Sequence, residues 1–243
     1  MAWDPNAAVI MGPVRRILLI LSTALLTAAV VVLIDAALTL VWKEPVSSVY
    51  ASLRQDDADE QLAAIEAEFL AGLPEAELPA PADPDRVEAL ADLFEQQLVT
   101  GKPIGRIEIP SIDIDFAVIE GTDTASLQKG PGHYPKTALP GQGRTIGIAG
   151  HRTTYLAPFR DIDQIQRGDV IVLEMPYARF TYAVEKTKVV DPSDVQIVDD
   201  IGRERLVLTA CHPPYSAAER YAVFGRLDSV SLFGGEPGAW RAP

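Results

Sequence analysis

The longest apolar stretch of the chain runs from Ile17 to Ile34 and contains no charged side chain. Apolar character continues past Asp35 to Trp42. About twenty helical residues are enough to cross the hydrocarbon core of a bilayer, which is roughly 30 Å thick. No polar face interrupts the stretch, which disfavours a helix buried in a soluble protein. The pattern therefore predicts one membrane-spanning helix within residues 17–42.

The charges on the two sides of this stretch indicate its orientation. Arg15 and Arg16 precede it, whereas Lys43 and Glu44 follow it and cancel. Because cationic residues stay on the cytoplasmic side, we expect residues 1–16 in the cytoplasm and the remainder outside the cell. The alternative is a cleaved signal peptide, but the stretch is longer than a typical signal core and no small-x-small pattern follows promptly. We expect an uncleaved, single-pass anchor in the plasma membrane.

Residues 43–102 have a helical pattern with a proline-rich interruption. The first half carries apolar residues at helical spacing, namely Leu62, Ile65, Phe69 and Leu70. The segment "PEAELPAPADPD" breaks this helix, and "DPDRVEALADLFEQQLV" resumes helically with an acidic first turn. We interpret the region as an acidic, Ala/Pro-rich extracellular stalk that serves as a solvated spacer. A regulatory lid over an active site is the alternative.

From residue 103 onward, short alternating segments replace the helical pattern. In "SIDIDFAVIEG", the residues predicted to share one face of a strand are Ile112, Ile114, Phe116 and Val118. Further strand-like segments are residues 145–150, 169–175, 179–190, 205–211 and 220–227. Short strands separated by Gly, Pro and Asp, without helices alternating between them, predict a mainly β closed barrel or sandwich. We place this domain at residues 103–234, followed by a tail at 235–243.

Charge is distributed unevenly between these regions. The whole chain has a formal net charge of −13. Residues 44–100 hold 14 Asp and Glu against 2 Arg, whereas residues 101–243 hold 18 Asp and Glu against 16 Lys and Arg. The acidity therefore belongs mainly to the predicted stalk. Because nucleic-acid binding needs a basic face, we expect no nucleic-acid partner.

Few side chains could carry nucleophilic or metal chemistry, because the chain has one cysteine, Cys211, and three histidines. Neither a Cys-x-x-Cys nor a His-Glu-x-x-His pattern is present, so we expect no metal. His212 directly follows Cys211, so on a strand the two side chains would point to opposite faces. The glycines of "GQGRTIGIAG" lack the third dinucleotide-loop glycine and a Walker lysine, and we expect no cofactor.

Three residues at predicted strand ends suggest nucleophilic catalysis. Cys211 ends "RLVLTAC", His151 follows "TIGIAG", and Arg220 begins "RYAVF". A thiolate could attack a carbonyl, an imidazolium could protonate the leaving amine, and a guanidinium could stabilise the oxyanion. The residue types alone leave open the alternative of an inert buried cysteine.

Two longer segments carry a specific resemblance. The first is "GPGHYPKTALPGQGRTIGIAGHRTTYLAPFRDID", and the second is "LVLTACHPPYSAAERYAVF". Together with "IGRIEIPSIDI" they resemble the sortase family over about residues 103–234. Sortases are membrane-anchored cysteine transpeptidases of Gram-positive bacteria, so the resemblance implies an eight-stranded sortase β-barrel.

The resemblance also implies roles for individual residues. Cys211 matches the nucleophile, His151 the acid/base histidine and Arg220 the family arginine, with Arg226 as a less well placed fallback. In the family's Thr-Leu-x-Thr-Cys strand, Leu208 fits, but alanine replaces the threonine directly before the nucleophile. The residues implied to bind substrate or line the cleft are Tyr155, Thr209, Ala210 and His133, the last with a structural role as the alternative.

The subtype resembles the class E enzymes of actinobacteria, through "CHPPYSAAERYAV", "TTYLAPF" and the acidic stalk. The resemblance implies cleavage of Leu-Ala-x-Thr-Gly or Leu-Pro-x-Thr-Gly signals on secreted proteins. The acyl group would pass from a Cys thioester to the amine of a lipid-linked peptidoglycan precursor. A pilus-polymerising class C sortase is the alternative subtype. The alternative functions are a membrane-tethered cysteine peptidase, another thiol acyltransferase, and a non-catalytic β-domain.

Overall fold

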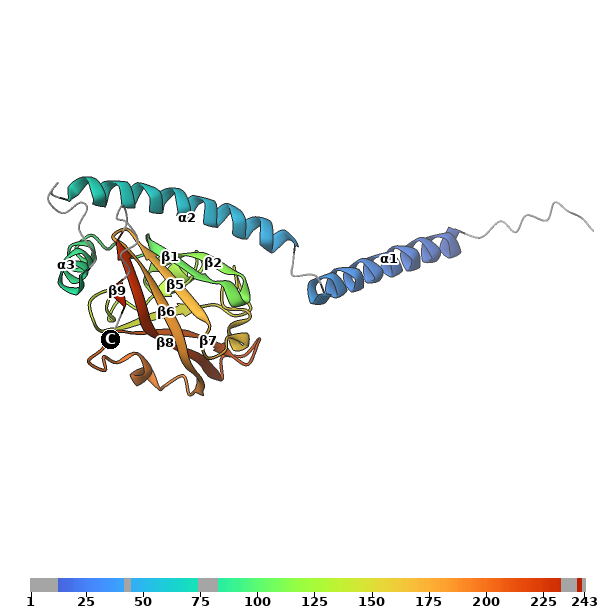
Figure 1. Ribbon diagram of the computed structural model, residues 1–243. Coiled ribbons are helices and arrows are strands. Elements are labelled where there is room, and N and C mark those ends of the chain that lie inside the picture. The colour runs from blue at the N-terminus through green and yellow to red at the C-terminus, as the bar shows by residue number, and fades with distance from the viewer. Residues whose placement is uncertain (1–12, 42–44, 74–82, 233–239, 242–243) are drawn as a thin grey trace, which may run out of the picture. The chain divides into compact units, whose positions relative to one another are not determined.

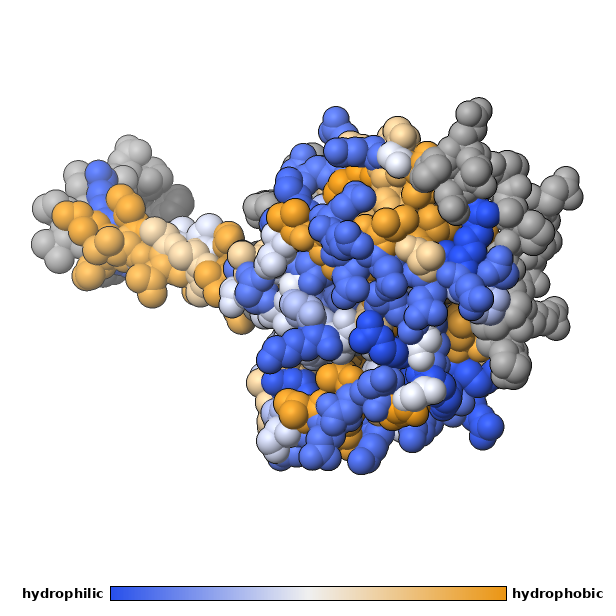
Figure 2. All heavy atoms as spheres, turned by 90° about the vertical axis from the view of Figure 1, so that its left-hand side faces the viewer, coloured by the Kyte–Doolittle hydropathy of each residue, from blue (hydrophilic) through white to orange (hydrophobic). Residues whose placement is uncertain are grey.

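The computed structural model describes residues 13–41, 45–73, 83–232 and 240–241 of the 243-residue chain. Contacts divide it into two units, residues 1–48 and 49–243. The first unit contains α1 (Pro13–Val41), whose segment Arg15–Ile34 is a candidate membrane span by length and composition. No part of that segment is buried, and Figure 2 shows hydrophobic residues along its surface. The predicted apolar helix is therefore present, while its orientation stays a prediction.

The second unit contains a closed barrel of eight strands (Figure 1). Its strands follow the order β6-β5-β1-β2-β3-β4-β7-β8, and a β6–β8 pairing closes the sheet. The strands are β1 (Pro103–Ile109), β2 (Ile114–Glu120), β3 (Gly132–His133), β4 (Thr145–Gly150), β5 (Val170–Met175), β6 (Ala178–Val190), β7 (Arg205–His212) and β8 (Glu219–Leu232). This confirms the predicted eight-stranded sortase-type barrel.

Short elements complete the fold. They are α4 (Thr124–Leu127), three 3-10 helices, η2 (Pro110–Ile112), η3 (Ile162–Gln164) and η4 (Val195–Val198), and β9 (Trp240–Arg241). The last of these pairs with β8 and lies within the predicted tail, most of which falls outside the described residues.

The prediction that a strand includes Ile112 is wrong, because the strand begins later in the chain. Residues 110–112 form η2, and Asp113 adopts a left-handed conformation with φ of 54°. This turn joins β1 to β2 as an antiparallel pair. Pro110 has no backbone N–H to donate to a strand ladder. The alternation of apolar and polar residues continues across this turn, so the alternation alone could not locate the start of the strand.

Strand β7 pairs with β4 in parallel on one side and with β8 in antiparallel orientation on the other. Successive side chains of a strand point to opposite faces. Leu206, Leu208 and Ala210 belong to the barrel core. Val207 lies in a separate outer cluster that also contains Phe224. The parity of each residue on β7 therefore decides whether its side chain faces the core or the outer surface.

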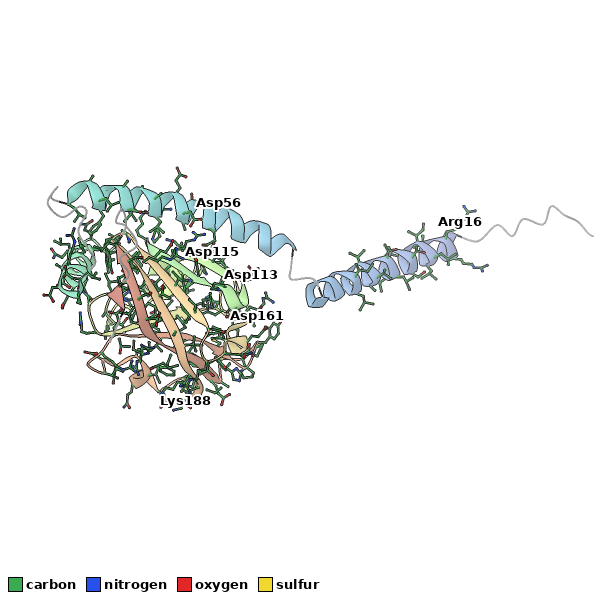
Figure 3. The ribbon with its side chains drawn as sticks, in the orientation of Figure 1. Arg16, Asp56, Asp113, Asp115, Asp161 and Lys188 are labelled. Atoms are coloured by element: carbon green, nitrogen blue, oxygen red, sulfur yellow. The ribbon has the colours of Figure 1, made fainter. Side chains whose placement is uncertain are left out.

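Helix α2 (Pro45–Gly72) packs on the barrel rather than standing free in solvent. The Gln55 side chain accepts a hydrogen bond from the Ala117 N–H (2.8 Å) and donates one to the Lys129 carbonyl (3.0 Å). Arg106 of β1 bonds both Asp59 of α2 and Asp115 of β2, the latter labelled in Figure 3. The interpretation of this segment as a solvated spacer is therefore wrong for its helices.

Helix α3 (Pro84–Glu95) begins as its sequence suggests, with Asp83 as the N-cap accepting a hydrogen bond from the Arg86 N–H. Its apolar face is part of the barrel core and consists of Val87, Leu90, Ala91 and Phe94. The two helices therefore contribute apolar surface to the same folded unit, and a fragment beginning at residue 101 would lack it.

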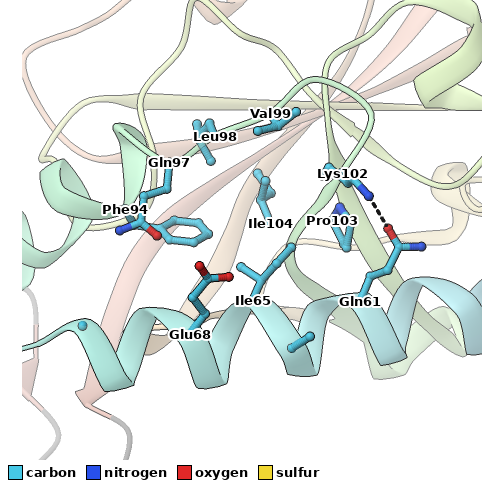
Figure 4. A pocket seen from close by; sticks show the side chains of 12 residues that line it. Gln61, Ile65, Glu68, Phe94, Gln97, Leu98, Val99, Lys102, Pro103 and Ile104 are labelled. Carbon is cyan, nitrogen blue, oxygen red and sulfur yellow. Dashed lines mark hydrogen bonds between the residues drawn. The ribbon is translucent and has the colours of Figure 1, made fainter.

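The position of α3 excludes it as a lid over Cys211. The Gln142 side chain, which precedes β4, donates to Asp92 and Glu95 of α3 at 2.8 Å each. Residues at the far end of β4 and β7 lie about 20 Å away, at roughly 3.3 Å per residue. A pocket of about 670 Å³ lies between α2 and the chain around Leu98 and Lys102 (Figure 4). Its lining contains no cysteine or histidine, so the candidate chemistry lies elsewhere.

Candidate active site

The register of three neighbouring strands brings the predicted catalytic residues together. Strands β4 and β7 pair in parallel up to Gly150 opposite Ala210. Continuing this register by one residue sets His151 beside Cys211. On the other side of β7, Cys211 is directly paired with Arg220 of β8. Neighbouring strands lie about 4.7–4.9 Å apart, so this register predicts one row made of His151, Cys211 and Arg220.

Cys211 lies on the outer face of the barrel. It shares strand parity with Val207, which packs in the outer cluster, and not with Leu208, which packs in the core. Its side chain is half-exposed and makes no disulfide. A half-exposed thiol at the end of a buried strand is accessible to a substrate, unlike an inert core cysteine.

His151 has an unused hydrogen-bonding atom. Its Nε2 is buried and has no partner among the described residues. The imidazole packs against the Tyr155 ring, with a centroid distance of 4.9 Å. This burial lowers the pKa of His151 below its ordinary value of 6.5, because desolvation disfavours the imidazolium. A buried polar atom without a partner is uncommon and indicates a group available to a ligand or reactant.

Arg220 is held by its own loop. Its Nη1 donates to the carbonyl oxygens of Ala217 (3.0 Å) and Glu219 (2.9 Å). Arg226, the fallback candidate, is paired with Arg205 at the other end of β7. The two arginines are six positions apart on β8, which corresponds to about 20 Å. The register therefore associates Arg220, and not Arg226, with Cys211.

A groove of about 350 Å³ runs along the outer face beside this row. Thr209 and Arg220 line it together with Tyr134 and the connection between β6 and β7. The Tyr134 and Thr209 hydroxyls share a hydrogen bond of 2.9 Å. Sequence reasoning did not single out Tyr134, although its place directly after His133 in "GPGHYP" was a signal.

The remaining predicted substrate-binding residues occupy different environments. Tyr155 is 49% exposed, adopts a left-handed φ of 54°, and its hydroxyl accepts a hydrogen bond from Gln128 (3.0 Å). Ala210 faces the barrel core, so only its backbone could meet a substrate. His133 is buried, with its ring nitrogens on Glu120 (2.8 Å) and the Ala138 carbonyl (3.1 Å). These contacts favour the structural alternative for His133.

His212 points away from the thiol, as its parity predicts. Its Nδ1 lies 2.7 Å from Nη1 of Arg152, and its ring lies 5.7 Å from that of Tyr221. No group of three or more His, Cys, Asp or Glu that could hold a metal occurs within the described part of the chain. The chemistry available at the row is therefore that of thiol, imidazole and guanidinium.

Comparisons with known proteins agree with this geometry. The Sortase domain matches residues 107–228, half of the chain. Sortase D of Bacillus subtilis (strain 168) is 38% identical over 131 residues, which cover 52% of this chain and 65% of that protein. The chain thus spans slightly less than two thirds of that relative's length.

Solved structures of sortases also resemble this chain. Sortase E from Streptomyces avermitilis is 35% identical with a TM-score of 0.51, covering 55% of this chain and 93% of that one. Sortase E1 from Streptomyces coelicolor, solved with a tripeptide in the active site, is 28% identical with a TM-score of 0.53. That match covers 58% of this chain and 98% of the solved one. The chain belongs to the sortase family.

Proposed function

We propose that this protein is a membrane-anchored cysteine transpeptidase that cleaves a sorting signal between Thr and Gly. Cys211 is the nucleophile, His151 the general acid/base, and Arg220 stabilises the oxyanion or holds the substrate backbone. The observation that carries the proposal is the strand register: Cys211 of β7 is paired with Arg220 of β8, and His151 directly follows the β4 residue that is paired with Ala210. Membership in the sortase family supports the same roles.

The proposed first half-reaction forms a thioester. The Cys211 thiolate attacks the Thr carbonyl. Arg220 then releases the Ala217 and Glu219 carbonyl oxygens and donates hydrogen bonds to the developing oxyanion instead. The C–N bond then breaks, and the Gly amine leaves with the proton of the His151 imidazolium. In the second half, an amine of a lipid-linked peptidoglycan precursor attacks the thioester, gives its proton to His151, and releases the thiolate.

The protonation state of the pair limits the rate. With ordinary pKa values of about 8.5 and 6.5, only about 1% of the pair is thiolate–imidazolium. Burial lowers the pKa of His151, which makes the imidazolium scarcer still in the absence of substrate.

The groove beside the row fits an extended peptide. It is lined by Tyr134, Thr209 and Arg220 and has a volume of about 350 Å³. Ligand pockets of this size commonly combine apolar walls with a few polar groups that fix orientation. Tyr155 stands half-exposed beside His151 and is proposed to take part in recognising the sorting motif.

Class E is the subtype we propose, with Leu-Ala-x-Thr-Gly preferred over Leu-Pro-x-Thr-Gly. Two Streptomyces class E structures resemble the chain over most of their own length. A class C lid would carry an aromatic residue after Asp-Pro, whereas Asp85 follows Asp83–Pro84 here and the pair begins α3 at the far end of the barrel. The candidate span at Arg15–Ile34 would hold the enzyme in the plasma membrane, with the barrel on the extracellular side.

The test uses the full-length chain in detergent micelles, because α2 and α3 belong to the folded unit. Paired Leu-Ala-x-Thr-Gly and Leu-Pro-x-Thr-Gly peptides are supplied with triglycine, and Cys211→Ala is the matched control. We expect ligated product from both peptides, faster from the Ala peptide, and none from the control.

Each alternative function predicts another result. A cysteine peptidase would give hydrolysis without ligation at any triglycine concentration. A non-catalytic domain would give neither product, and Cys211→Ala would then lower the melting temperature without changing the reaction. A faster reaction with the Pro peptide would overturn the class E assignment but not the transpeptidase.

A further inference from the structure

A buried arginine lies directly behind the proposed active site. Arg152 is 2% exposed and follows His151 in the chain. Its Nε donates to the Arg160 carbonyl (3.2 Å), its Nη1 contacts His212 Nδ1 (2.7 Å), and its Nη2 forms an ion pair with Asp163 of η3. All three nitrogens of the guanidinium are thus used, and none of them serves the proposed mechanism.

The hydrogen-bond chemistry fixes the state of His212. An arginine can only donate, so His212 Nδ1 must accept, and the ring is neutral with its proton on Nε2. The bond is charge-assisted and buried on the arginine side, which makes it stronger than a bond between neutral groups. His212 is therefore an acceptor for Arg152 rather than a second base for the adjacent thiol.

The position of this bond relates it to the catalytic pair. The β4–β7 ladder ends with Gly150 opposite Ala210. The next pair in register is His151 and Cys211 on the outer face, and the pair after it is Arg152 and His212. Parity sends the second pair inward, toward the core that contains Ala210. A side-chain bond thus continues the pairing of the two chain segments beyond the end of the backbone ladder.

Asp163 extends the same connection to the loop that carries Tyr155. The Arg152 side chain spans this loop, since it also binds the carbonyl of Arg160. We refer to Arg152, His212 and Asp163 as the clip.

We propose that the clip positions the catalytic pair, with Arg152 and His212 as positioning residues that hold His151 against Cys211. The inference rests on the proposed function, because it assumes that these two residues react together. Without the His212 acceptor, the segment after β4 can separate from the end of β7. Misplacement of reacting groups by about 1 Å can cost about a hundredfold in rate.

The main test compares two substitutions in the full-length chain. His212→Leu removes the acceptor at similar size, whereas His212→Asn retains an oxygen near the position of Nδ1. We expect His212→Leu to lower kcat for the sorting peptide by about tenfold to a hundredfold with little change in KM. We expect His212→Asn to recover most of that loss.

A second readout follows the thiol without any substrate. The rate of Cys211 alkylation by iodoacetamide is measured against pH for each variant. When the imidazole lies close, an early thiolate–imidazolium component raises the rate below the ordinary thiol pKa. We expect His212→Leu to lose this component and His212→Asn to keep it. Tyr182→Phe is the stability control, because it removes a buried hydrogen bond to Glu204 at the other end of β7.

Asp163→Asn is the second variant should His212→Leu fail to fold, because Asp163 is 40% exposed. It weakens the hold on Arg152, and we expect a smaller fall in kcat in the same direction. Wild-type kcat and alkylation profiles in the folded clip variants, with only the melting temperature lowered as in Tyr182→Phe, would overturn the proposal. A wild-type enzyme inactive on peptides would count against the proposed function alone, since the alkylation profiles would still test the clip.

Discussion

The two ends of β7 both carry polar groups, but they are built in different ways. Before its N-terminal end, Glu204 accepts hydrogen bonds from the N–H groups of Gly141 (3.0 Å) and Gly143 (3.2 Å). It also accepts one from the Tyr182 hydroxyl (2.7 Å). Both carboxylate oxygens are thus engaged, and they join the loop before β4 to β6 and β7.

At the C-terminal end, groups are left unused. Cys211 is half-exposed, and Nε2 of His151 is buried with no partner within the described residues. Beneath them, all three guanidinium nitrogens of Arg152 have partners, one of which is Nδ1 of His212. An unpartnered nitrogen alone does not distinguish the two ends, because Arg205 Nε at the N-terminal end is also buried without a partner within the described residues. The contrast is that Glu204 accepts three hydrogen bonds, whereas the C-terminal end presents a free thiol next to the unpartnered imidazole nitrogen. Substitutions at the two ends should therefore separate stability from activity.

The largest effect is expected at the thiol. Cys211→Ala should lower the transpeptidation rate by at least about 10³-fold, because it removes the single thiol of the chain and with it the proposed nucleophile. The melting temperature should stay near that of the wild type, since the side chain lies half-exposed on the outer face. Peptide cleavage and thermal unfolding measure the two quantities. A large fall in melting temperature with an unchanged transpeptidation rate would contradict this prediction, because the C-terminal end of β7 would then serve stability rather than activity.

Glu204→Ala should produce the opposite result. It leaves two backbone N–H groups and the Tyr182 hydroxyl without their acceptor, which should lower the free energy of unfolding by about 2–4 kcal/mol. Urea unfolding measures the loss. The alkylation rate of Cys211 in the folded variant should match the wild type. A slowed alkylation would show that the two ends are coupled.

Glu204→Gln should change the pH dependence of stability rather than the contacts. Burial raises the pKa of Glu204 above its ordinary value of 4.5, against the opposing effect of its hydrogen bonds. The folded state therefore favours the protonated form, and the wild type loses stability as pH rises from 4.5 through the raised pKa. The amide lacks this titration, so the variant should gain stability relative to the wild type over that range. Unfolding at several pH values checks the sign, and a constant difference would contradict the assignment.

The smallest effect is expected at Tyr155. Replacing Tyr155 by Ala uncovers the His151 imidazole, so its lowered pKa should rise toward 6.5. A reaction that needs both thiolate and imidazolium has a bell-shaped pH profile whose acid limb follows the lower of the two pKa values. The acid limb of kcat/KM should lie below pH 6.5 in the wild type and shift upward in the variant. Gln128→Ala is the control, because it removes only the hydrogen bond to the Tyr155 hydroxyl. A downward shift would contradict the desolvation argument.

Much of the fold was predictable from local patterns. Strand 145–150 was predicted with its observed ends, and the capped helix at Asp83 follows directly from its residues. The hairpin at Asp113 was missed, because alternation continues across a turn that a proline and a left-handed residue create. The packing of α2 was also missed, although its apolar residues were recognised: Phe69 lies in the barrel core, and Ile65 and Leu70 pack against that core. A helical apolar stripe does not by itself say which surface covers it.

By itself the sequence determined the apolar N-terminal helix, the β-rich domain and the identities of the three candidate catalytic residues. These depend on hydrophobic period, on residue chemistry and on motifs that are local in the chain. Only the tertiary structure decided which side chains meet. Residues 211 and 220 become neighbours through strand register, residue 151 follows the β4 residue that is paired with Ala210, and Arg152 and His212 meet on the inner face. Register is a cooperative property of the closed barrel, because a shift of one residue would exchange the faces of every side chain on the strand.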